Sequence, residues 1–496
     1  MTSLAHFEAI AATIVLPSKA VIDGKLRPAQ SGMTFDNISP RNGQLINKIA
    51  QCNEQDVNAA VAAARAAFDD RRWRNFHYRE KKRIMYKLAD LMERDLETIA
   101  LLESIDSGKP IRDTMAFDVP SAIRTLRYYT EALDKVYGEV GPETADRFSY
   151  AVHEPLGVVG AIMPWNFPLH LTMWKVAPAL AMGNSIVVKP AELTSMTAIK
   201  LGELALEAGV PAGVLNVVTG KGSVAGKAIA LHMDVDMLTF TGSGTVGRML
   251  MKYAADSNLK RVSLELGGKS PHIIFADCPD LDAAAAHAAF GIFYNQGEVC
   301  TAGSRLLVDQ KIRDVFLDKI ISAAKGFVPG DPLAPETNFG AMVSESQMNT
   351  VLGFIDTARK EGASPALGGK RVRADSGGFY VEPTVFDGVS PDSTLAKEEV
   401  FGPVLAVTTF RDADEALRIA NNTIFGLASG VWTRDISLAH RAAREIKAGL
   451  VWINGWDSCD ITMPFGGFKQ SGFGRDRSLH ALYKYADLKS VSITIR

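Results

Sequence analysis

The chain has 496 residues, 47% of them hydrophobic and 22% charged, with 54 Lys and Arg against 56 Asp and Glu. This length exceeds what one hydrophobic core usually serves, so we expect two or three domains. The net charge of −2 gives no electrostatic attraction to nucleic acid or to an anionic membrane, and no apolar run is long enough to span a bilayer. We therefore expect neither nucleic acid nor a membrane as a partner.

The cysteines show no pairing or metal-binding pattern. Cys52, Cys278, Cys300 and Cys459 are scattered without CxxC spacing, which argues against a disulfide framework and against a zinc site. The apolar residues 9–17 have no basic residue before them and no small-residue cleavage pattern after them. We therefore expect no signal peptide, no metal and a cytoplasmic location.

The residue pattern in most of the first half of the chain predicts alternating strands and helices. The Ala-rich stretch 56–68 and the segment 95–110 are typical of helices, and the second ends at Gly108 and Pro110. Four short runs rich in β-branched residues then alternate with helical segments; the runs are 157–163, 185–190, 214–220 and 237–242, and the helices lie near 168–183, 194–208, 222–232 and 245–256. This pattern predicts a parallel sheet covered by helices on both faces. Ligands bind beyond the carboxyl ends of such strands. Asn166, Lys189, Glu192, Gly242 and Ser243 fall there.

A second α/β pattern runs from residue 271 to about 470. Its predicted strands are 271–277, 305–310, 404–410, 427–432 and 450–455. Cys300 falls in this half and Glu265 at the junction, so we expect the active site between the two domains. The alternating tail 486–496 predicts an edge strand, which needs a partner and so indicates a homo-oligomer.

Cys300 and Glu265 are the candidate catalytic pair. Cys300 lies in the stretch NQGEVCTAG (295–303), and Glu265 opens ELGGKSP (265–271). An ionised thiol is a strong nucleophile, and a carboxylate at the head of a glycine turn can act as a base. The pair indicates covalent catalysis. The alternative is that Cys300 is an inert small hydrophobe.

A glycine loop follows one of the predicted strands. GSGTVG (242–247) satisfies the pattern GxGxxG, in which the backbone approaches a pyrophosphate at a helix N-terminus. The ribose-binding acid about 20 residues further on would be Glu265, which conflicts with its role as a base. Lys189 and Glu192, at the end of another strand, are a better ribose pair. A capped turn without a ligand is the alternative interpretation.

Seven motifs in order give the chain a family resemblance. They are MPWNFP (163–168), KPAE (189–192), FTGS (240–243), ELGGKSP (265–271), QGEVC (296–300), EEVFGPV (398–404) and PFGGFKQSG (464–472). Over nearly its whole length the chain resembles the NAD(P)-dependent aldehyde dehydrogenases. The resemblance implies an α/β fold with two Rossmann-like doubly wound domains and a small β oligomerisation extension. The NAD-binding domain would comprise residues 1–133 and 156–267, the catalytic domain 268–474, and the oligomerisation segments 134–155 and 475–496 of a dimer or tetramer.

The resemblance also implies site residues. Cys300 would be the nucleophile, Glu265 the general base and Asn166 the oxyanion donor. The family's cofactor domain does not depend on GxGxxG, so Glu265 is released for catalysis. Cofactor contacts would come from Trp165, Lys189, Glu192, Gly242, Ser243, Glu399 and Phe401. NAD is expected, with NADP as a weaker cofactor, because Glu192 repels the extra phosphate of NADP. Lys175 is either a catalytic residue or one half of a structural ion pair.

The expected substrate follows from the segment 453–467, which in the family walls the outer substrate tunnel. Trp456, Asp457 and Asp460 would suit a cationic tail, although Asp460 is equally well explained as a solvated loop acid. Phe167, Trp174 and Phe465 would line the apolar section. The resemblance extends to 4-guanidinobutyraldehyde and γ-glutamyl-γ-aminobutyraldehyde dehydrogenases of polyamine and arginine breakdown, so we expect an ω-amino or ω-guanidino aldehyde. The alternatives are uncharged aliphatic or aromatic aldehydes, or a thiol esterase without redox chemistry.

Overall fold

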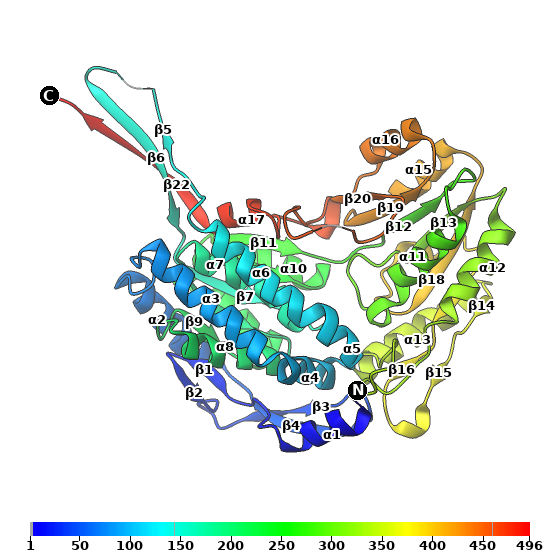
Figure 1. The fold of residues 1–496 in the computed structure, drawn as a ribbon, viewed down its shortest axis with the longest axis horizontal. Helices are drawn as coiled ribbons and strands as arrows, with labels where there is room; N and C mark the ends of the chain where they lie inside the picture. The colour runs from blue at the N-terminus through cyan, green and yellow to red at the C-terminus, as the bar shows by residue number, and fades with distance from the viewer. Residues whose placement is uncertain (1–2, 143, 459) are drawn as a thin grey trace.

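The protein consists of two lobes and a projecting arm of strands (Figure 1). The computed structural model describes residues 3–142, 144–458 and 460–496. Each lobe is built on a largely parallel sheet covered by helices, and the arm is a separate antiparallel sheet. This arrangement confirms the predicted fold class.

The first lobe contains a sheet of order β2-β1-β9-β8-β7-β10-β11-β21. The four predicted strands of this half are confirmed as β7 (Val158–Ile162), β8 (Ser185–Lys189), β9 (Leu215–Val217) and β10 (Met237–Thr241), and β11 (Arg261–Glu265) follows them. These five strands pair in parallel. Every residue of β7, β8 and β10 is buried, because helices cover both faces of the sheet. The edges are β1 (Ala20–Ile22), β2 (Lys25–Arg27) and β21 (Gly472–Phe473).

The strand order reverses between β7 and β10. From β7 the chain builds outward to β8 and β9 on one side, then returns to place β10 and β11 on the other. Such a reversal opens a crevice beyond the carboxyl ends of the two strands. Asn166 follows β7, and Ser243 follows β10 as the N-cap of α10 (Gly244–Ala255). The topology therefore places two predicted site residues beside one crevice.

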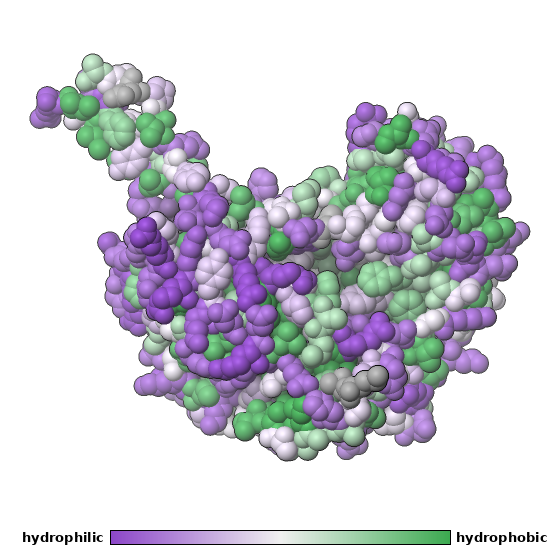
Figure 2. Space-filling model, in the orientation of Figure 1, coloured by the Kyte–Doolittle hydropathy of each residue, from purple (hydrophilic) through white to green (hydrophobic). Residues whose placement is uncertain are grey.

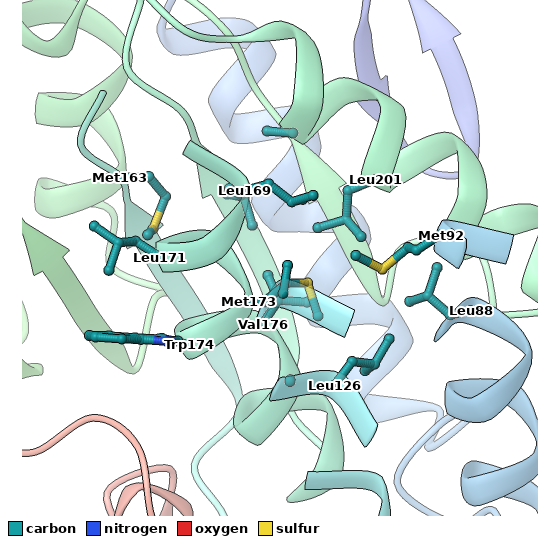
Figure 3. Close-up of a cluster of buried hydrophobic side chains, with 14 of the residues drawn as sticks. Leu88, Met92, Leu126, Met163, Leu169, Leu171, Met173, Trp174, Val176 and Leu201 are labelled. Atoms are coloured by element: carbon teal, nitrogen blue, oxygen red, sulfur yellow. The ribbon is translucent and has the colours of Figure 1, made fainter. Parts of the chain in front are cut away.

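The helices of the first lobe pack around α7 (Pro168–Ala181), which is buried along almost its whole length. Figure 3 shows its apolar side chains meeting those of α3 (Tyr78–Arg94), α6 (Val119–Ala132) and α8 (Met196–Ala208). The other helices are α1 (Leu4–Thr13), α2 (Glu54–Asp69), α4 (Leu96–Ser107), α5 (Ile111–Asp113) and α9 (Lys227–Leu231). The helix α4 ends at Gly108, whose φ of 76° is the left-handed conformation of a helix C-cap. The segment predicted as a helix near 222–232 is a π-helical turn, Gly222–Gly226, followed by α9.

The second lobe contains a sheet of order β14-β17-β18-β13-β12-β19-β20. The five predicted strands are confirmed as β12 (Pro271–Ile274), β13 (Arg305–Asp309), β18 (Val404–Phe410), β19 (Ala428–Trp432) and β20 (Leu450–Ile453), and they are joined by β14 (Pro365–Leu367) and β17 (Thr384–Phe386). Its helices include α11 (Leu281–Phe293), α12 (Arg313–Ala324), α13 (Glu345–Lys360), α15 (Ala413–Asn421) and α16 (Ile436–Glu445). Space-filling atoms show a hollow between this lobe and the first (Figure 2).

The arm is a three-stranded sheet of order β22-β6-β5. The predicted terminal edge strand is confirmed as β22 (Ala486–Thr494), which pairs antiparallel with β6 (Arg147–Pro155) and is separated by it from β5 (Glu139–Val140). The strand β21 pairs with β11, so residues 472 and 473 join the first sheet. The expected boundary at 474 assigned them to the second domain. Within the described ranges, no helix is long and apolar enough to cross a membrane, and no three His, Cys, Asp or Glu residues group as a metal site.

Candidate active site

Cys300 lies on a strained loop between α11 and β13. Two residues of this loop, Asn295 and Gln296, have φ angles of 48° and 56°, a conformation that non-glycine residues rarely adopt. Gly297 has a φ of 73°, and a Cβ there would lie 2.3 Å from the carbonyl oxygen of Gly402. Strain of this kind persists where surrounding contacts impose it, so the position of Cys300 is determined by its neighbours.

The amide of Asn166 is one of those neighbours. Its Nδ2 donates to the carbonyl oxygen of Glu298 at 2.9 Å, while Asn295 Nδ2 donates to the same oxygen at 3.2 Å and to the carbonyl of Asn166 at 3.1 Å. A carboxamide has two N–H groups, and only one of them is used in the contact with Glu298. The second N–H group has no acceptor among the described residues.

Negative charge surrounds the thiol of Cys300. Burial, and then the carboxylates of Glu399, Glu265 and Asp457, together raise the pKa of Cys300 to about 12. The thiol is therefore neutral at pH 7 when no counter-charge is present.

Glu265 is the last residue of β11 and is almost completely buried. No described residue forms a hydrogen bond with either of its carboxylate oxygens. Burial, and then the charge of Asp476, raise its pKa well above the ordinary value. Asp476 is paired with Lys175 and Lys484. Lys175 is thus half of a buried ion pair, one of its two predicted roles.

The ends of β8 and β10 carry further predicted residues. Lys189 is 2% exposed, and its Nζ donates to Glu192 Oε2 at 3.1 Å and to the carbonyl of Pro190 at 2.9 Å. A Cβ at Gly242 would lie 2.4 Å from the ring of Phe240. Ser243 Oγ accepts the N–H of Val246 at 3.3 Å and so caps α10.

Glu399 and Phe401 stand on the opposite side of the crevice, in the second lobe. Glu399 Oε1 accepts the N–H of Gly268 at 2.8 Å, and a Cβ at Gly267 would lie only 2.0 Å from Glu399 Oε2. Burial raises the pKa of Glu399 to about 7. Phe401 has a φ of 54°, and its ring meets that of Trp165 edge to face at 5.1 Å. Carboxylates for ribose hydroxyls and a helix N-terminus for a pyrophosphate fit a dinucleotide.

A pocket opens at Cys300. Five of the six predicted substrate residues line it, namely Phe167, Trp174, Asp457, Asp460 and Phe465. The structure therefore brings together residues from α7, from the loop of Cys300 and from the segment after β20. It also adds residues that the prediction did not name individually, namely Phe117, Ser121, Arg124, His170, Tyr294 and Arg477.

The sixth predicted residue, Trp456, does not line this pocket. Its indole is 5% exposed and stacks on His272, with ring centroids 4.6 Å apart. It fills space that Gly291, Gly303 and Gly430 leave open, since a Cβ at any of the three would lie within about 3 Å of the ring. Trp456 is thus a core residue of the second lobe, and this position corrects the prediction of an indole at the tunnel mouth.

The two aspartates of the same segment are both exposed but have different surroundings. Desolvation by the neighbouring protein, partly offset by the charge of Arg477, raises the pKa of Asp457 to about 6. Asp460 is exposed, and its Oδ1 accepts the N–H of Thr462 at 2.9 Å. Arg477 donates a hydrogen bond to the carbonyl oxygen of Asp460. Cys459 lies outside the described residues.

A helical period could have revealed some of the missed residues. Phe167, His170, Leu171 and Trp174 follow the spacing i, i+3, i+4, i+7 along α7, and all four line the pocket. Ser121, Arg124 and Thr125 repeat that spacing on α6. Arg477 belongs to no helical spacing of this kind.

The strained loop of Cys300, the buried carboxylates and the dinucleotide crevice fit a dinucleotide-dependent oxidoreductase. The chain belongs to the aldehyde dehydrogenase family, whose model matches residues 26–491. It is 47% identical to the aminoacetaldehyde dehydrogenase of Pseudomonas aeruginosa over 494 residues, and 46% identical to the NADP/NAD-dependent aldehyde dehydrogenase PuuC of Escherichia coli over 492, with 99% of both chains covered in each case. A solved indole-3-acetaldehyde dehydrogenase complexed with NAD+ superimposes with a TM-score of 0.99 at 51% identity, over 100% of both chains. The protein is an NAD(P)-dependent aldehyde dehydrogenase.

Proposed function

We propose that the protein oxidises an ω-amino or ω-guanidino aldehyde to its carboxylic acid through a thioester on Cys300. The observation that carries the proposal is one pocket that ends at Cys300 and contains Asp457 and Asp460. The nucleophile and two carboxylates thus face the same space. An ammonium or guanidinium tail is attracted to such carboxylates.

The first half of the reaction uses Cys300 and Asn166. The Cys300 sulfur adds to the aldehyde carbon, and the carbonyl oxygen becomes an oxyanion. The second N–H of the Asn166 amide and the backbone N–H of Cys300 donate to that oxyanion. Bound NAD supplies the acceptor for the hydride that leaves the resulting thiohemiacetal.

The second half uses Glu265. The thioester left on Cys300 reacts with water, and Glu265 removes the proton from that water. The acid is released and the thiol is restored, so that aldehyde, NAD+ and water become carboxylate, NADH and two protons. Burial raises the pKa of Glu265, which makes its carboxylate a stronger base towards water than an ordinary glutamate.

Seven residues are proposed to hold the cofactor. Lys189 and Glu192 bind the adenosine ribose, Gly242, Ser243 and Trp165 flank the pyrophosphate, and Glu399 with Phe401 holds the nicotinamide ribose. The carboxylate of Glu192 favours NAD over NADP by repelling the additional phosphate. Support comes from Glu192 standing beside Lys189 at the end of β8.

An aromatic aldehyde is the second candidate substrate. Four aromatic side chains of the pocket contact one another in a closed ring, in which neighbouring centroids are 5.6 to 6.3 Å apart. They are Phe117, Phe167, His170 and Tyr294. Such a lining packs well against a flat ring. The similarity to an indole-3-acetaldehyde dehydrogenase supports this candidate, as the similarity to an aminoacetaldehyde dehydrogenase supports the first.

We also propose a role for each segment of the chain. Residues 1–133 and 156–267 would bind the cofactor, and 268–474 would carry the nucleophile. Residues 134–155 and 475–496 would join subunits of a dimer or tetramer. Among the described residues, no strand pairs with the outer edges of β22 and β5, and this supports the last role, because exposed edges pair with other strands.

A panel of aldehydes of matched length tests the function. Cationic, uncharged and aromatic aldehydes would be assayed for NADH and NADPH formation, with Cys300→Ala and Glu265→Gln beside the parent protein. We expect NADH from the cationic aldehydes, none with Cys300→Ala, and a stalled thioester, detectable by mass, with Glu265→Gln. Normal turnover by Cys300→Ala would disprove the mechanism, and ester cleavage without any nicotinamide reduction would favour a thiol esterase.

A further inference from the structure

Helix α7 begins without a cap of its own. Its N-cap residue is Phe167, which provides no side-chain acceptor, and Pro168 follows it. The first N–H groups of a helix need acceptors from outside the helix backbone. One of them, the N–H of Leu169, donates to Glu103 Oε2 at 3.1 Å. Glu103 is fully buried on α4, so a residue 66 positions earlier in the chain caps α7 from a neighbouring helix.

The turn that Glu103 caps is the turn that follows Asn166. The proposed oxyanion donor directly precedes the N-cap residue of α7, and its Nδ2 reaches the loop of Cys300 through the carbonyl of Glu298 at 2.9 Å. A first turn whose N–H groups lack an acceptor is less stable and unwinds more readily. Unwinding at this place would change the direction of the Asn166 amide relative to Cys300.

A buried ion pair contacts the same turn. Lys109 and Asp118 are both fully buried, and Lys109 Nζ lies 2.9 Å from Asp118 Oδ1. The same ammonium lies 3.7 Å from the centroid of the Phe167 ring, which is a cation–π contact. One contact on the backbone of Leu169 and one on the ring of Phe167 therefore hold the residues that follow Asn166.

A second carboxyl on α4 caps a different helix. Asp106 lies one turn after Glu103 and is also buried. Its Oδ2 accepts the N–H of Met196, the first residue of α8, at 2.9 Å, and its Oδ1 accepts Asn37 Nδ2 at 2.7 Å. The helix α8 carries none of the three proposed catalytic residues. Asp106 is therefore a matched reference for a carboxyl that only stabilises the fold.

We propose that Glu103 is a positioning residue for the oxyanion donor, because its cap on α7 fixes the direction of the Asn166 amide. Glu103 is not among the described residues that line the Cys300 pocket, so it acts through Asn166 and does not itself touch the aldehyde. The pair of Lys109 and Asp118 assists by holding the ring of Phe167. This inference rests on the role of Asn166 in the proposed function.

A double-mutant cycle between Glu103 and Asn166 tests it. Stopped-flow measurements at saturating NAD and aldehyde would give the rate of NADH formation in the first turnover. The aldehydes are 4-aminobutyraldehyde and pentanal, which has a methyl group in place of the ammonium. We expect Glu103→Leu to lower this rate about tenfold or more, and equally for both aldehydes, because every aldehyde forms the oxyanion. In the Asn166→Ala background the same substitution should lower the rate by less than about twofold.

Glu103→Gln and Asp106→Leu are the controls. Burial, and then the charge of Asp118, raise the pKa of Glu103 to about 8, so a glutamine matches the neutral carboxyl at pH 7 and still offers an oxygen to the N–H of Leu169. We expect Glu103→Gln to keep the parent rate. Asp106→Leu should lower the melting temperature at least as much as Glu103→Leu, since it removes two hydrogen bonds, but should also keep the parent rate.

Glu103→Asp replaces Glu103→Leu if the leucine variant does not fold. It keeps a carboxyl but withdraws it from Leu169 by one methylene group, and should lower the first-turnover rate at least about threefold. A parent-like rate in these Glu103 variants would overturn the inference, as would an equal rate loss in Asp106→Leu or in the Asn166→Ala background. A parent-like rate in Asn166→Ala alone would instead refute the oxyanion role in the proposed function, and this inference with it.

Discussion

The role of Asn166 can be separated from its structural contacts. Asn166→Ala removes the carboxamide that we propose as the oxyanion donor. It also removes one hydrogen bond to the carbonyl of Glu298, but that oxygen still accepts a bond from Asn295 Nδ2 at 3.2 Å. The Glu298 carbonyl therefore keeps one of its two hydrogen bonds, and the loop that carries Cys300 stays bonded to the backbone of residue 166 through Asn295 Nδ2.

The expected losses in rate and in stability differ widely. Loss of one oxyanion donor lowers kcat by about 10²–10³, or about 2.7–4 kcal/mol. Loss of one neutral hydrogen bond lowers the free energy of unfolding by only about 0.5–1.5 kcal/mol. Steady-state kinetics with saturating NAD should show kcat and kcat/KM falling together, since the contact exists only in the transition state. Thermal unfolding would measure the stability.

Asn295→Gly is the matched control for this prediction. It removes the second bond to the Glu298 carbonyl and the bond to the carbonyl of Asn166, while glycine tolerates the φ of 48° at this position. We expect it to lower kcat by less than about tenfold, because the oxyanion donor remains. If Asn295→Gly costs as much as Asn166→Ala, the rate loss comes from displacement of the loop and the oxyanion assignment is refuted.

Three further predictions concern the cofactor, the substrate and the thiol. Gly267→Ala would place a Cβ within 2.0 Å of Glu399 Oε2, and we expect it to raise the KM for NAD at least about tenfold. An unchanged KM would contradict the proposed role of Glu399 in cofactor binding. The pKa of Asp457 is about 6, so the KM for a cationic aldehyde should fall as the pH rises from 5 to 7 and Asp457 ionises. In Asp457→Asn the KM should not change over this range. An equal pH dependence of the KM for an uncharged aldehyde would count against the charge contact. Because the pKa of Cys300 is about 12, alkylation of the NAD-free protein by iodoacetamide should accelerate about tenfold per pH unit between pH 7 and 10, and a plateau below pH 9 would contradict this.

The fold was predictable where the sequence pattern is continuous. Strands buried on both faces must be apolar throughout, and runs such as 158–162 and 185–189 carry that signal without ambiguity. Strands of two or three residues, such as β14 and β17, have no period to detect. The π-helical turn at Gly222–Gly226 also escaped prediction, since its glycines fit an ordinary helix start as well as a distorted one.

The site was predictable only in part, for a physical reason. Cys300, Glu265 and Asn166 stand in motifs whose backbone requirements are local. The wall of the pocket is a product of packing between segments far apart, as with Arg477 over Trp174. Trp456 shows the same limit, because its burial depends on three distant glycines that leave room for the ring.

The charges around Cys300 also determine when the thiol can ionise. With a pKa of about 12, only about one thiol in 10⁵ is ionised at pH 7. The neighbouring carboxyls are shifted upward as well, to about 7 for Glu399 and about 6 for Asp457, so the site resists any additional negative charge. Groups that interact so strongly titrate together, and loss of the thiol proton is easiest when a carboxylate takes it up. Oxidised nicotinamide brings a positive charge to the same crevice, which lowers the cost of the thiolate. Activation of Cys300 is therefore expected to follow cofactor binding, which protects the free enzyme from reaction of its thiol with stray electrophiles.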